Sequence, residues 1–297
     1  MKSHGRFQDC TRLSRSPIFA ALAAACLLAS CHRAGVLDPQ GPVASAEWLI
    51  MINSTAIMLV VVLPVIVLTL AFAWWYRASN ARAAYRPDWS YSGRIELVVW
   101  SIPTMVVILL GAVAWTGSHL LDPARKLPSD APPIRIEVVS LDWKWLFIYP
   151  DQQVAAVNQL VVPVGAPIEF ALTSATVMNA FFVPQLGSMI YTMPGMTTRL
   201  NLLAERAGDY PGLSSQFSGD GFSDMRFLVH AVPPSEFESW LARTRGAGPA
   251  LNADTYSQLA RSDSNTKVQT YGSVDPTLFE RIVQQTAPRG ASLHKEH

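Results

Sequence analysis

Two long apolar runs constrain this chain more than any other feature of its sequence. One extends from Trp48 to Tyr76 and the other from Leu97 to Leu121, and neither contains Asp, Glu, Lys or Arg. As helices that rise about 1.5 Å per residue, both are long enough to cross a hydrocarbon core of roughly 30 Å. Each helix satisfies its own backbone hydrogen bonds, as lipid requires. We therefore predict a two-helix transmembrane hairpin, followed by a separate water-soluble domain.

The composition of the chain excludes several classes of protein. Hydrophobic residues make up 50% of its 297 positions, which is above the norm for an ordinary soluble domain because two spans are included. The formal net charge is only +1. No basic run indicates a nucleic-acid partner. All three cysteines, Cys10, Cys26 and Cys31, precede the hairpin. The region after the hairpin therefore has neither a disulfide nor a thiolate ligand for a metal.

The first thirty residues predict an export signal. A basic start is followed by an apolar stretch from Ile18 to Leu28, which is too short to span a membrane. This stretch ends in Leu28-Ala29-Ser30-Cys31, which resembles a bacterial lipobox. We expect residues 1–30 to be a lipoprotein signal peptide and Cys31 to carry acyl chains such as palmitate, tethering the N-terminus to membrane lipid. An ordinary cleavage site near Cys31 is the alternative interpretation.

The loop between the two apolar runs predicts their orientation. It contains the basic residues Arg77, Arg82, Arg86 and Arg94 and the acidic residues Asp88 and Glu96. Short Arg-rich loops stay in the cytoplasm, so residues 31–121 form a tether and a multi-pass hairpin in the bacterial inner membrane. The main domain is then periplasmic. Glu96, at the inner end of the second run, is favourable at a helix N-terminus and can relay protons if a partner subunit covers it.

The region after the hairpin has the pattern of an all-β domain. Residues 122–133 are rich in Pro and charge and are typical of a linker. Short β-like runs then follow at Ile134–Val139, Trp143–Tyr149, Leu160–Val164, Ile168–Leu172, Met178–Val183, Thr198–Leu203 and Arg226–Val232. Turn residues separate them, among them Ala207-Gly208-Asp209. This spacing predicts a β-sandwich or Greek-key barrel over residues 134–245.

The C-terminal part of the chain predicts short helices. Ser235 with Glu238 three residues later forms the pattern of a capping box, so a helix is expected from Ser235 to about Thr244. Glycines and a proline then break this helix. Residues 246–297 form a C-terminal extension whose apolar residues indicate short helices packed on another surface, and the tail after about Ala287 is expected to lack order.

The aromatic string Val139-Ser140-Leu141-Asp142-Trp143-Lys144-Trp145-Leu146-Phe147-Ile148-Tyr149-Pro150 adds a specific resemblance. Together with the lipobox, the hairpin and the string Ile95 to Pro103, it resembles subunit II of haem–copper terminal oxidases. The resemblance covers nearly the whole mature chain. It implies that the periplasmic barrel is cupredoxin-like.

This family has a copper-binding and a copper-free branch. Cytochrome c oxidases bind a dinuclear copper centre through two Cys, two His, a Met and the backbone carbonyl of a Glu, and bridging thiolates share the electron between the coppers. The matching positions in this chain are Asn179, Phe217, Gly219, Gly221, Met225 and Leu228. All six have changed, so the resemblance implies the ubiquinol-oxidising, cytochrome bo-type branch and no metal in this chain.

The resemblance also implies a function and partners. The chain would be the non-redox subunit II of a proton-pumping ubiquinol oxidase in the aerobic respiratory chain, with no catalytic residue of its own. It would pack on and cap subunit I, which holds haem and copper, beside other small membrane subunits. The complex would oxidise ubiquinol rather than cytochrome c, and Glu96 would lie at the cytoplasmic mouth of a proton-uptake channel.

Two other functions fit parts of the sequence. One is a cytochrome c oxidase subunit with a variant copper site, and the other is a stand-alone membrane lipoprotein with a role in binding or assembly. Thioether binding of Cu(I) would use the methionines Met178, Met189, Met193, Met196 and Met225. Methionine is more often a flexible filler of cores, so we expect these side chains to be core residues. We expect His230 to have a structural role.

Overall fold

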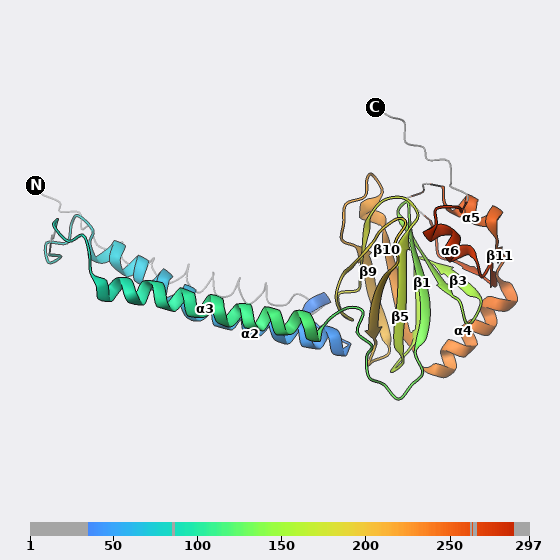
Figure 1. The fold of residues 1–297 in the computed structure, drawn as a ribbon, viewed down its shortest axis with the longest axis horizontal. Helices are drawn as coiled ribbons and strands as arrows, with labels where there is room; N and C mark the ends of the chain where they lie inside the picture. Colours follow the sequence, from blue (N-terminus) through green and yellow to red (C-terminus); the bar gives the residue numbers. More distant parts are fainter. Residues whose placement is uncertain (1–34, 85–86, 262, 264–265, 288–297) are drawn as a thin grey trace, which may run out of the picture. The chain divides into compact units, whose positions relative to one another are not determined.

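The computed structural model of this chain describes residues 35–84, 87–261, 263 and 266–287. The predicted signal peptide, the acylation position Cys31, the loop residue Arg86 and the C-terminal tail after residue 287 lie outside these ranges. The described elements are a pair of long helices, a β-domain and a C-terminal extension (Figure 1).

The two apolar runs form the long helices α2 (Pro42–Trp75) and α3 (Gly93–Leu120), after a short 3-10 turn η1 (Gly35–Leu37). Both are long and apolar enough to span a membrane. Each begins several residues before its uncharged run. For α2 the reason is the proline at its start, which favours helix initiation there. The helices approach closely at Gly117, where an added Cβ would lie 2.9 Å from Ile50 Cδ1.

The β-domain consists of two main sheets. In chain order, its strands are β1 (Ile134–Leu141), β2 (Lys144–Tyr149), β3 (Val154–Val157), β4 (Gln159–Pro163), β5 (Pro167–Ser174), β6 (Asn179–Phe182), β7 (Ile190–Thr192), β8 (Thr198–Leu203), β9 (Gly208–Ser214) and β10 (Arg226–Val232). A six-stranded sheet, which also takes in β12 (Gln269–Tyr271), has the order β12-β3-β2-β1-β5-β8, and the facing sheet has the order β4-β10-β9-β6-β7. The pairs β1–β5 and β4–β10 are parallel among otherwise antiparallel neighbours. The prediction of an all-β barrel is confirmed.

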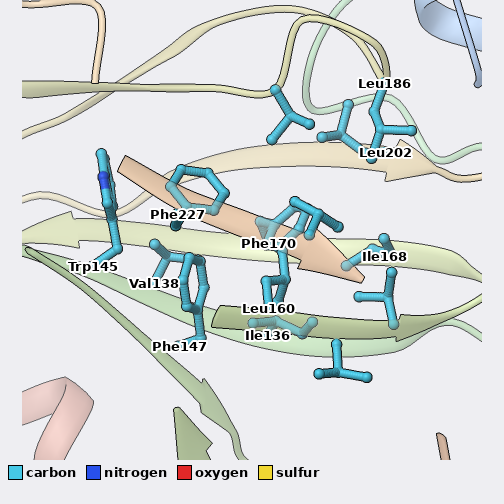
Figure 2. Packing of buried hydrophobic residues seen from close by; sticks show 14 of the residues in the cluster. Ile136, Val138, Trp145, Phe147, Leu160, Ile168, Phe170, Leu186, Leu202 and Phe227 are labelled. Carbon is cyan, nitrogen blue, oxygen red and sulfur yellow. The ribbon is translucent and has the colours of Figure 1, made fainter. Parts of the chain in front are cut away.

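Aromatic rings fill the space between the two sheets (Figure 2). Trp145 and Phe147 of β2 are fully buried, and both make edge-on contacts with Phe181 of β6. Phe181 stacks on Phe227 of β10 with ring centroids 5.0 Å apart. Such rings contribute through buried area and through their preferred edge and offset geometries. The aromatic string of the sequence is therefore part of the core.

Strand β9 corrects one prediction. Ala207-Gly208-Asp209 was expected to be a turn, whereas β9 begins at Gly208 and continues through Pro211 and Gly212. Proline lacks the N–H that a strand donates to its neighbour. Pro211 is tolerated on the β6 side because β6 pairs only with the C-terminal end of β9, so no hydrogen bond to β6 is lost. Gly212 is required, since an added Cβ would lie 2.1 Å from the Phe227 ring. Two residues that usually weaken strands are thus accommodated by this one.

The C-terminal extension covers the outer face of the six-stranded sheet. It follows α4 (Pro234–Ala247) and comprises β11 (Ala250–Leu251), α5 (Ala253–Leu259), β12, β13 (Ser273–Val274) and α6 (Leu278–Val283). Its apolar residues pack on the outward-facing side chains of β1 and β2 as a second core. The extension is therefore more than the expected short helices, because β12 pairs with β3 and adds a strand to the sheet.

The capping box predicted at Ser235 is wrong. The N-cap of α4 is Pro233, the helix begins at Pro234, and no side chain caps it. A proline at the first helical position has the φ angle that a helix needs and lacks the N–H that would otherwise be unpaired. The backbone of Pro234 thus starts the helix one residue earlier than the polar pattern indicated.

Candidate functional site

The segment between β9 and β10 contains most of the changed copper-ligand positions. It includes the short 3-10 helix η2 (Phe222–Asp224). Its two ends are fixed to the sheet, because Ser215 donates its N–H to Ala180 O over 3.1 Å and Ser214 donates its N–H to Met225 O over 3.1 Å. We call residues 215–225 the β9–β10 loop. It is held against the strands that position the other candidate residues.

The indole of Trp143 closes this loop. Trp143 lies in the tight turn between β1 and β2 with φ of 62°, an uncommon left-handed conformation for a bulky residue. Its Nε1 donates a hydrogen bond to Ser218 O over 3.1 Å. An added Cβ at Gly221 would lie 2.4 Å from Trp143 Cδ2. The ring thus occupies the space that a side chain at position 221 would need.

Gly219 contributes to the same arrangement. Its φ of 104° suits glycine, and an added Cβ would lie 3.5 Å from the Trp143 ring. The glycines at the Glu position and at one thiolate position of the copper-binding branch therefore both lie under one indole. Phe217, at the other thiolate position, instead turns to solvent and is 72% exposed, with its ring edge-on to Phe222 at 5.7 Å.

Asn179 and Met225, at the two imidazole positions, are brought together by Ser214. Both side chains are buried. Ser214 Oγ donates to Asn179 Oδ1 over 3.2 Å, while the Ser214 N–H donates to Met225 O. Asn179 Nδ2 in turn donates to Val177 O over 3.2 Å. The amide is satisfied within the protein, and the Met225 side chain is part of the apolar core.

Leu228, at the Met position, lies on the other side of its strand. Residues of β10 alternate in burial, and the neighbouring Phe227 points into the core. Leu228 instead lines an open groove with Asn158 and Val268. The six positions of the sequence pattern therefore do not converge on one point as a set of metal donors.

The residues of this region do not fit a dinuclear copper centre. A copper pair of that kind needs thiolate and imidazole donors, and the matched positions offer an amide, a thioether and apolar groups. In the described ranges, no three His, Cys, Asp or Glu side chains are grouped so that they could hold a metal ion. The Trp143 ring also fills the space beside position 221. We therefore derive no step through copper in this chain.

Glu96 lies at the opposite end of the long helices from the β-domain linker. It is in the first turn of α3 and is exposed on this chain. At about 1.5 Å per residue, it is about 36 Å along the helix from Leu120. This separation is close to the thickness of the hydrocarbon core of a membrane.

Two polar residues that the sequence did not single out connect the barrel to the extension. Lys144 is buried and its Nζ donates to Leu259 O over 3.0 Å and to Arg261 O over 2.8 Å, at the end of α5. Burial lowers the pKa of the Lys144 ammonium. Asn158 accepts from Trp145 N–H over 2.8 Å and donates to Thr266 O over 2.9 Å. The sequence did carry a signal for Lys144, because it stands between two tryptophans. Successive residues of a strand point to opposite faces, so a lysine between two core tryptophans lies on the other face of the sheet.

The two histidines in the described residues, His119 and His230, have local partners. His230 Nδ1 lies 2.6 Å from Asp209 Oδ1 on the neighbouring strand, which agrees with the structural role expected from the sequence. His119 Nδ1 lies 2.8 Å from Trp115 O in the last turn of α3. His119 therefore contacts an atom of its own helix, and His230 contacts a residue of the neighbouring strand. The two rings do not share a site.

The β-domain and the extension each match a protein-family model. Residues 149–232 match the family described as "Cytochrome C oxidase subunit II, periplasmic domain". Residues 245–288 match the "COX Aromatic Rich Motif". The two sheets, the β9–β10 loop and the preceding helices thus define a membrane-anchored, cupredoxin-like domain of the oxidase subunit II class.

Comparison with curated relatives shows which branch of the oxidase subunit II class this chain resembles. The chain is 46% identical over 279 residues to "Cytochrome bo(3) ubiquinol oxidase subunit 2" of Pseudomonas aeruginosa, covering 93% of this chain and 84% of the relative. It is 46% identical over 273 residues to "Ubiquinol oxidase subunit 2" of Acetobacter aceti, covering 91% and 88%. A "Quinol oxidase subunit 2" of Bacillus cereus is 35% identical over 227 residues, covering 76% and 78%. The chain belongs to the family of quinol oxidase subunit 2.

Proposed function

We propose that this chain is the non-redox subunit II of a proton-pumping terminal oxidase that oxidises ubiquinol and reduces oxygen to water. One observation carries the proposal: the positions that would hold copper contain no thiolate or imidazole, and Trp143 fills the space beside Gly221. A barrel without copper cannot receive an electron from a soluble cytochrome c. Reducing equivalents then reach the complex through the bilayer, as a lipid-soluble quinol.

The role of the chain within the complex is to pack and to cap. Haem and copper belong to subunit I, where they supply the chemistry of oxygen reduction. Helices α2 and α3 expose apolar side chains along their length, for example Leu70 and Val107, and these need lipid or neighbouring helices as partners. We place them against subunit I and other small membrane subunits, with the β-domain over the periplasmic face of subunit I.

Purification of the native complex tests this function. We expect the chain to co-isolate with a multispan, haem-containing partner, and the complex to oxidise ubiquinol but not reduced cytochrome c. Stoichiometric redox-active copper in residues 134–245, or rapid oxidation of cytochrome c, would support the variant cytochrome c oxidase instead. A stable haem-free monomer would support the stand-alone lipoprotein.

Glu96 is proposed to lie at the cytoplasmic mouth of a proton-uptake channel completed by subunit I. Its place in the first turn of α3, exposed on this chain, supports the role. Proton relay by a positioned carboxylate typically contributes a factor of about 100 or more, so Glu96→Ala should lower oxidase turnover at least roughly tenfold. Haem content and subunit stoichiometry should not change. Glu96→Asp should retain part of the turnover, and Asp88→Ala, in the loop that precedes α3, is the control. Unchanged turnover in Glu96→Ala rejects the role.

Cys31 is proposed to be acylated after removal of residues 1–30. The lipobox-like string Leu28-Ala29-Ser30-Cys31 supports this. Cells fed labelled palmitate should yield a labelled chain, and Cys31→Ser should remove the label while the hairpin keeps the chain in the membrane. Cys26→Ser is the matched control, and a label that survives Cys31→Ser contradicts the assignment.

A further inference from the structure

Strand β8 is the last strand of the six-stranded sheet, and only one of its edges is paired within that sheet. This paired edge faces β5, with Leu203 opposite Pro167 and Thr198 opposite Leu172. In the described part of the chain, no strand of the sheet is hydrogen-bonded to the other edge. An open edge presents N–H and C=O groups on which another chain can pair. The groups on this edge of β8 therefore need partners from elsewhere.

The segment before α2 lies against one end of the open edge. Glu205, two residues beyond β8, donates its N–H to Gln40 O over 3.0 Å, and Gln40 donates its own N–H to Gln185 O over 2.8 Å. Gly41 approaches the last residue of β8 so closely that an added Cβ would lie 2.3 Å from Leu203 O. Such an approach of two main chains needs glycine. Residues 40–41 thus occupy the place that a short piece of strand would take.

Side chains hold this segment in position. The two carboxylate oxygens of Asp38 accept hydrogen bonds from Gln40 Nε2 over 2.8 Å and from Gln185 Nε2 over 3.3 Å. Hydrogen bonds to an ionised group are stronger than those between neutral groups. Just beyond, Val43 and Ala44 of α2 are buried. The segment before α2 is therefore attached to the β-domain by side chains as well as by its main chain.

The segment after α3 lies against the middle of the same edge. Pro123 O accepts hydrogen bonds from the Asn201 N–H over 2.8 Å and from Asn201 Nδ2 over 3.4 Å. Three residues further on, Lys126 Nζ lies 3.0 Å from Glu169 Oε1 of β5. Residues 122–133, whose composition is typical of a linker, are therefore attached to the sheet.

The contacted residues of β8 follow the alternation of a strand. Alternate residues of a strand direct their N–H and C=O groups to the same edge. Asn201, Leu203 and Glu205 are such a set, and the main chain beside a membrane helix contacts each of them. Both membrane helices thus provide, from their ends next to the β-domain, the contacts that a further strand would make.

We propose that β8 is a joint built into this chain, in which the main chain flanking both membrane helices completes the open edge of the strand and fixes the barrel to the hairpin. A single attachment would let the barrel turn about one point, whereas two attachments on one strand restrict that motion. The joint forms within this chain, without a partner subunit, and does not depend on which electron donor the complex uses.

Hydrogen exchange of single backbone amides, measured on the full chain in lipid nanodiscs without partner subunits, tests the joint. The amides of Asn201 and Glu205 should be protected in the parent chain. Gly41→Ala places a methyl group against Leu203 O, so the Glu205 amide should exchange at least roughly tenfold faster, while Asn201 stays protected by Pro123. Gly111→Ala is the matched control, since an added Cβ there meets no atom within 4 Å.

A milder variant keeps the test decisive if Gly41→Ala unfolds the barrel. Asp38→Ala removes the acceptor of Gln40 and Gln185, and it should accelerate exchange of the Glu205 amide at least roughly threefold. Unchanged exchange in both variants overturns the proposal. Rapid exchange of Asn201 and Glu205 in the parent chain alone, with protection only in the assembled complex, also overturns it, because another subunit then closes the edge.

Discussion

The two faces of the six-stranded sheet are packed by different chemistry, although they come from the same strands. Successive residues of a strand point to opposite faces, so Trp145 and Phe147 enter the barrel core whereas Leu146 and Ile148 contact the extension. The inner face is apolar and aromatic. The outer face also contains the buried ammonium of Lys144 and the half-buried carboxylate of Glu137. The barrel core should therefore be insensitive to pH, whereas the docking of the extension should depend on it.

Glu137 shows the direction of that dependence. Burial, followed by the negative charges of Asp151 and Glu280, raises the pKa of Glu137 to about 7. Because this value lies above the ordinary one of 4.5, folding favours the protonated form. The stabilisation is complete below about pH 4.5 and is lost as the pH rises through about 7. The extension should therefore dock most tightly in mildly acidic surroundings.

The largest expected effect is on the inner face. Trp145→Ala should destabilise the barrel by about 3–5 kcal/mol, because it leaves a cavity among Phe147, Phe181 and Phe227. Thermal unfolding followed by circular dichroism measures the change. If this variant does not fold, the more conservative Phe147→Leu should cost about 1 kcal/mol. A loss near zero for both would mean that the aromatic core does not hold the barrel.

A smaller effect is expected on the outer face at Lys144. Lys144→Met should weaken the docking of the extension on the barrel by about 1–3 kcal/mol, because the carbonyls of Leu259 and Arg261 lose their hydrogen-bond donor. Limited proteolysis should cut the extension faster while the barrel unfolds at an unchanged temperature. Lys126→Met is the matched control, since that lysine is 82% exposed in its pair with Glu169 and should matter little. Equal protection of the extension in both variants would contradict the anchoring role of Lys144.

The smallest effect is expected at Glu137, and only at higher pH. Glu137→Gln should stabilise docking at pH 8 by about 1–2 kcal/mol after allowance for solvent screening of a half-buried group. It should make almost no difference at pH 4.5. Unfolding and proteolysis measured between these values should show a flatter pH profile than the parent, and the exposed Glu236→Gln should not. A parent profile that is already flat would show that the two faces do not differ in this way.

Much of the architecture followed from local patterns. The two apolar runs, the alternation in Ile134–Val139 and the turn residues between strands predicted the hairpin and the barrel because burial imposes these periods on the sequence. Strand β9 was not predicted from the sequence, because Pro211 and Gly212 are residues that weaken the local pattern of a strand. Its stability comes instead from pairing with β10 and from the ring of Phe227, which are distant contacts.

The candidate site likewise has features that the sequence predicts and features that only the tertiary structure shows. The absence of cysteine after Cys31 was readable from the sequence and by itself removed the bridging thiolates. The indole that lies over Gly221 was not readable, because Trp143 and the Ser218 carbonyl that fixes it are 75 residues apart. Contacts over such separations depend on which strands pair, and no local pattern encodes them.

The sequence by itself determined that this chain has two membrane-length helices, an all-β domain and no thiolate donors for copper in that domain. Only the tertiary structure decided that Trp143 fills the space beside Gly221, that Lys144 anchors the extension and that the main chain beside both membrane helices bonds to the open edge of β8. The prediction that the methionines are core residues is wrong for the three that are exposed, Met178, Met189 and Met196. Composition and periodicity act on neighbours along the chain, whereas these arrangements arise from strand pairing and packing between residues that folding alone brings together.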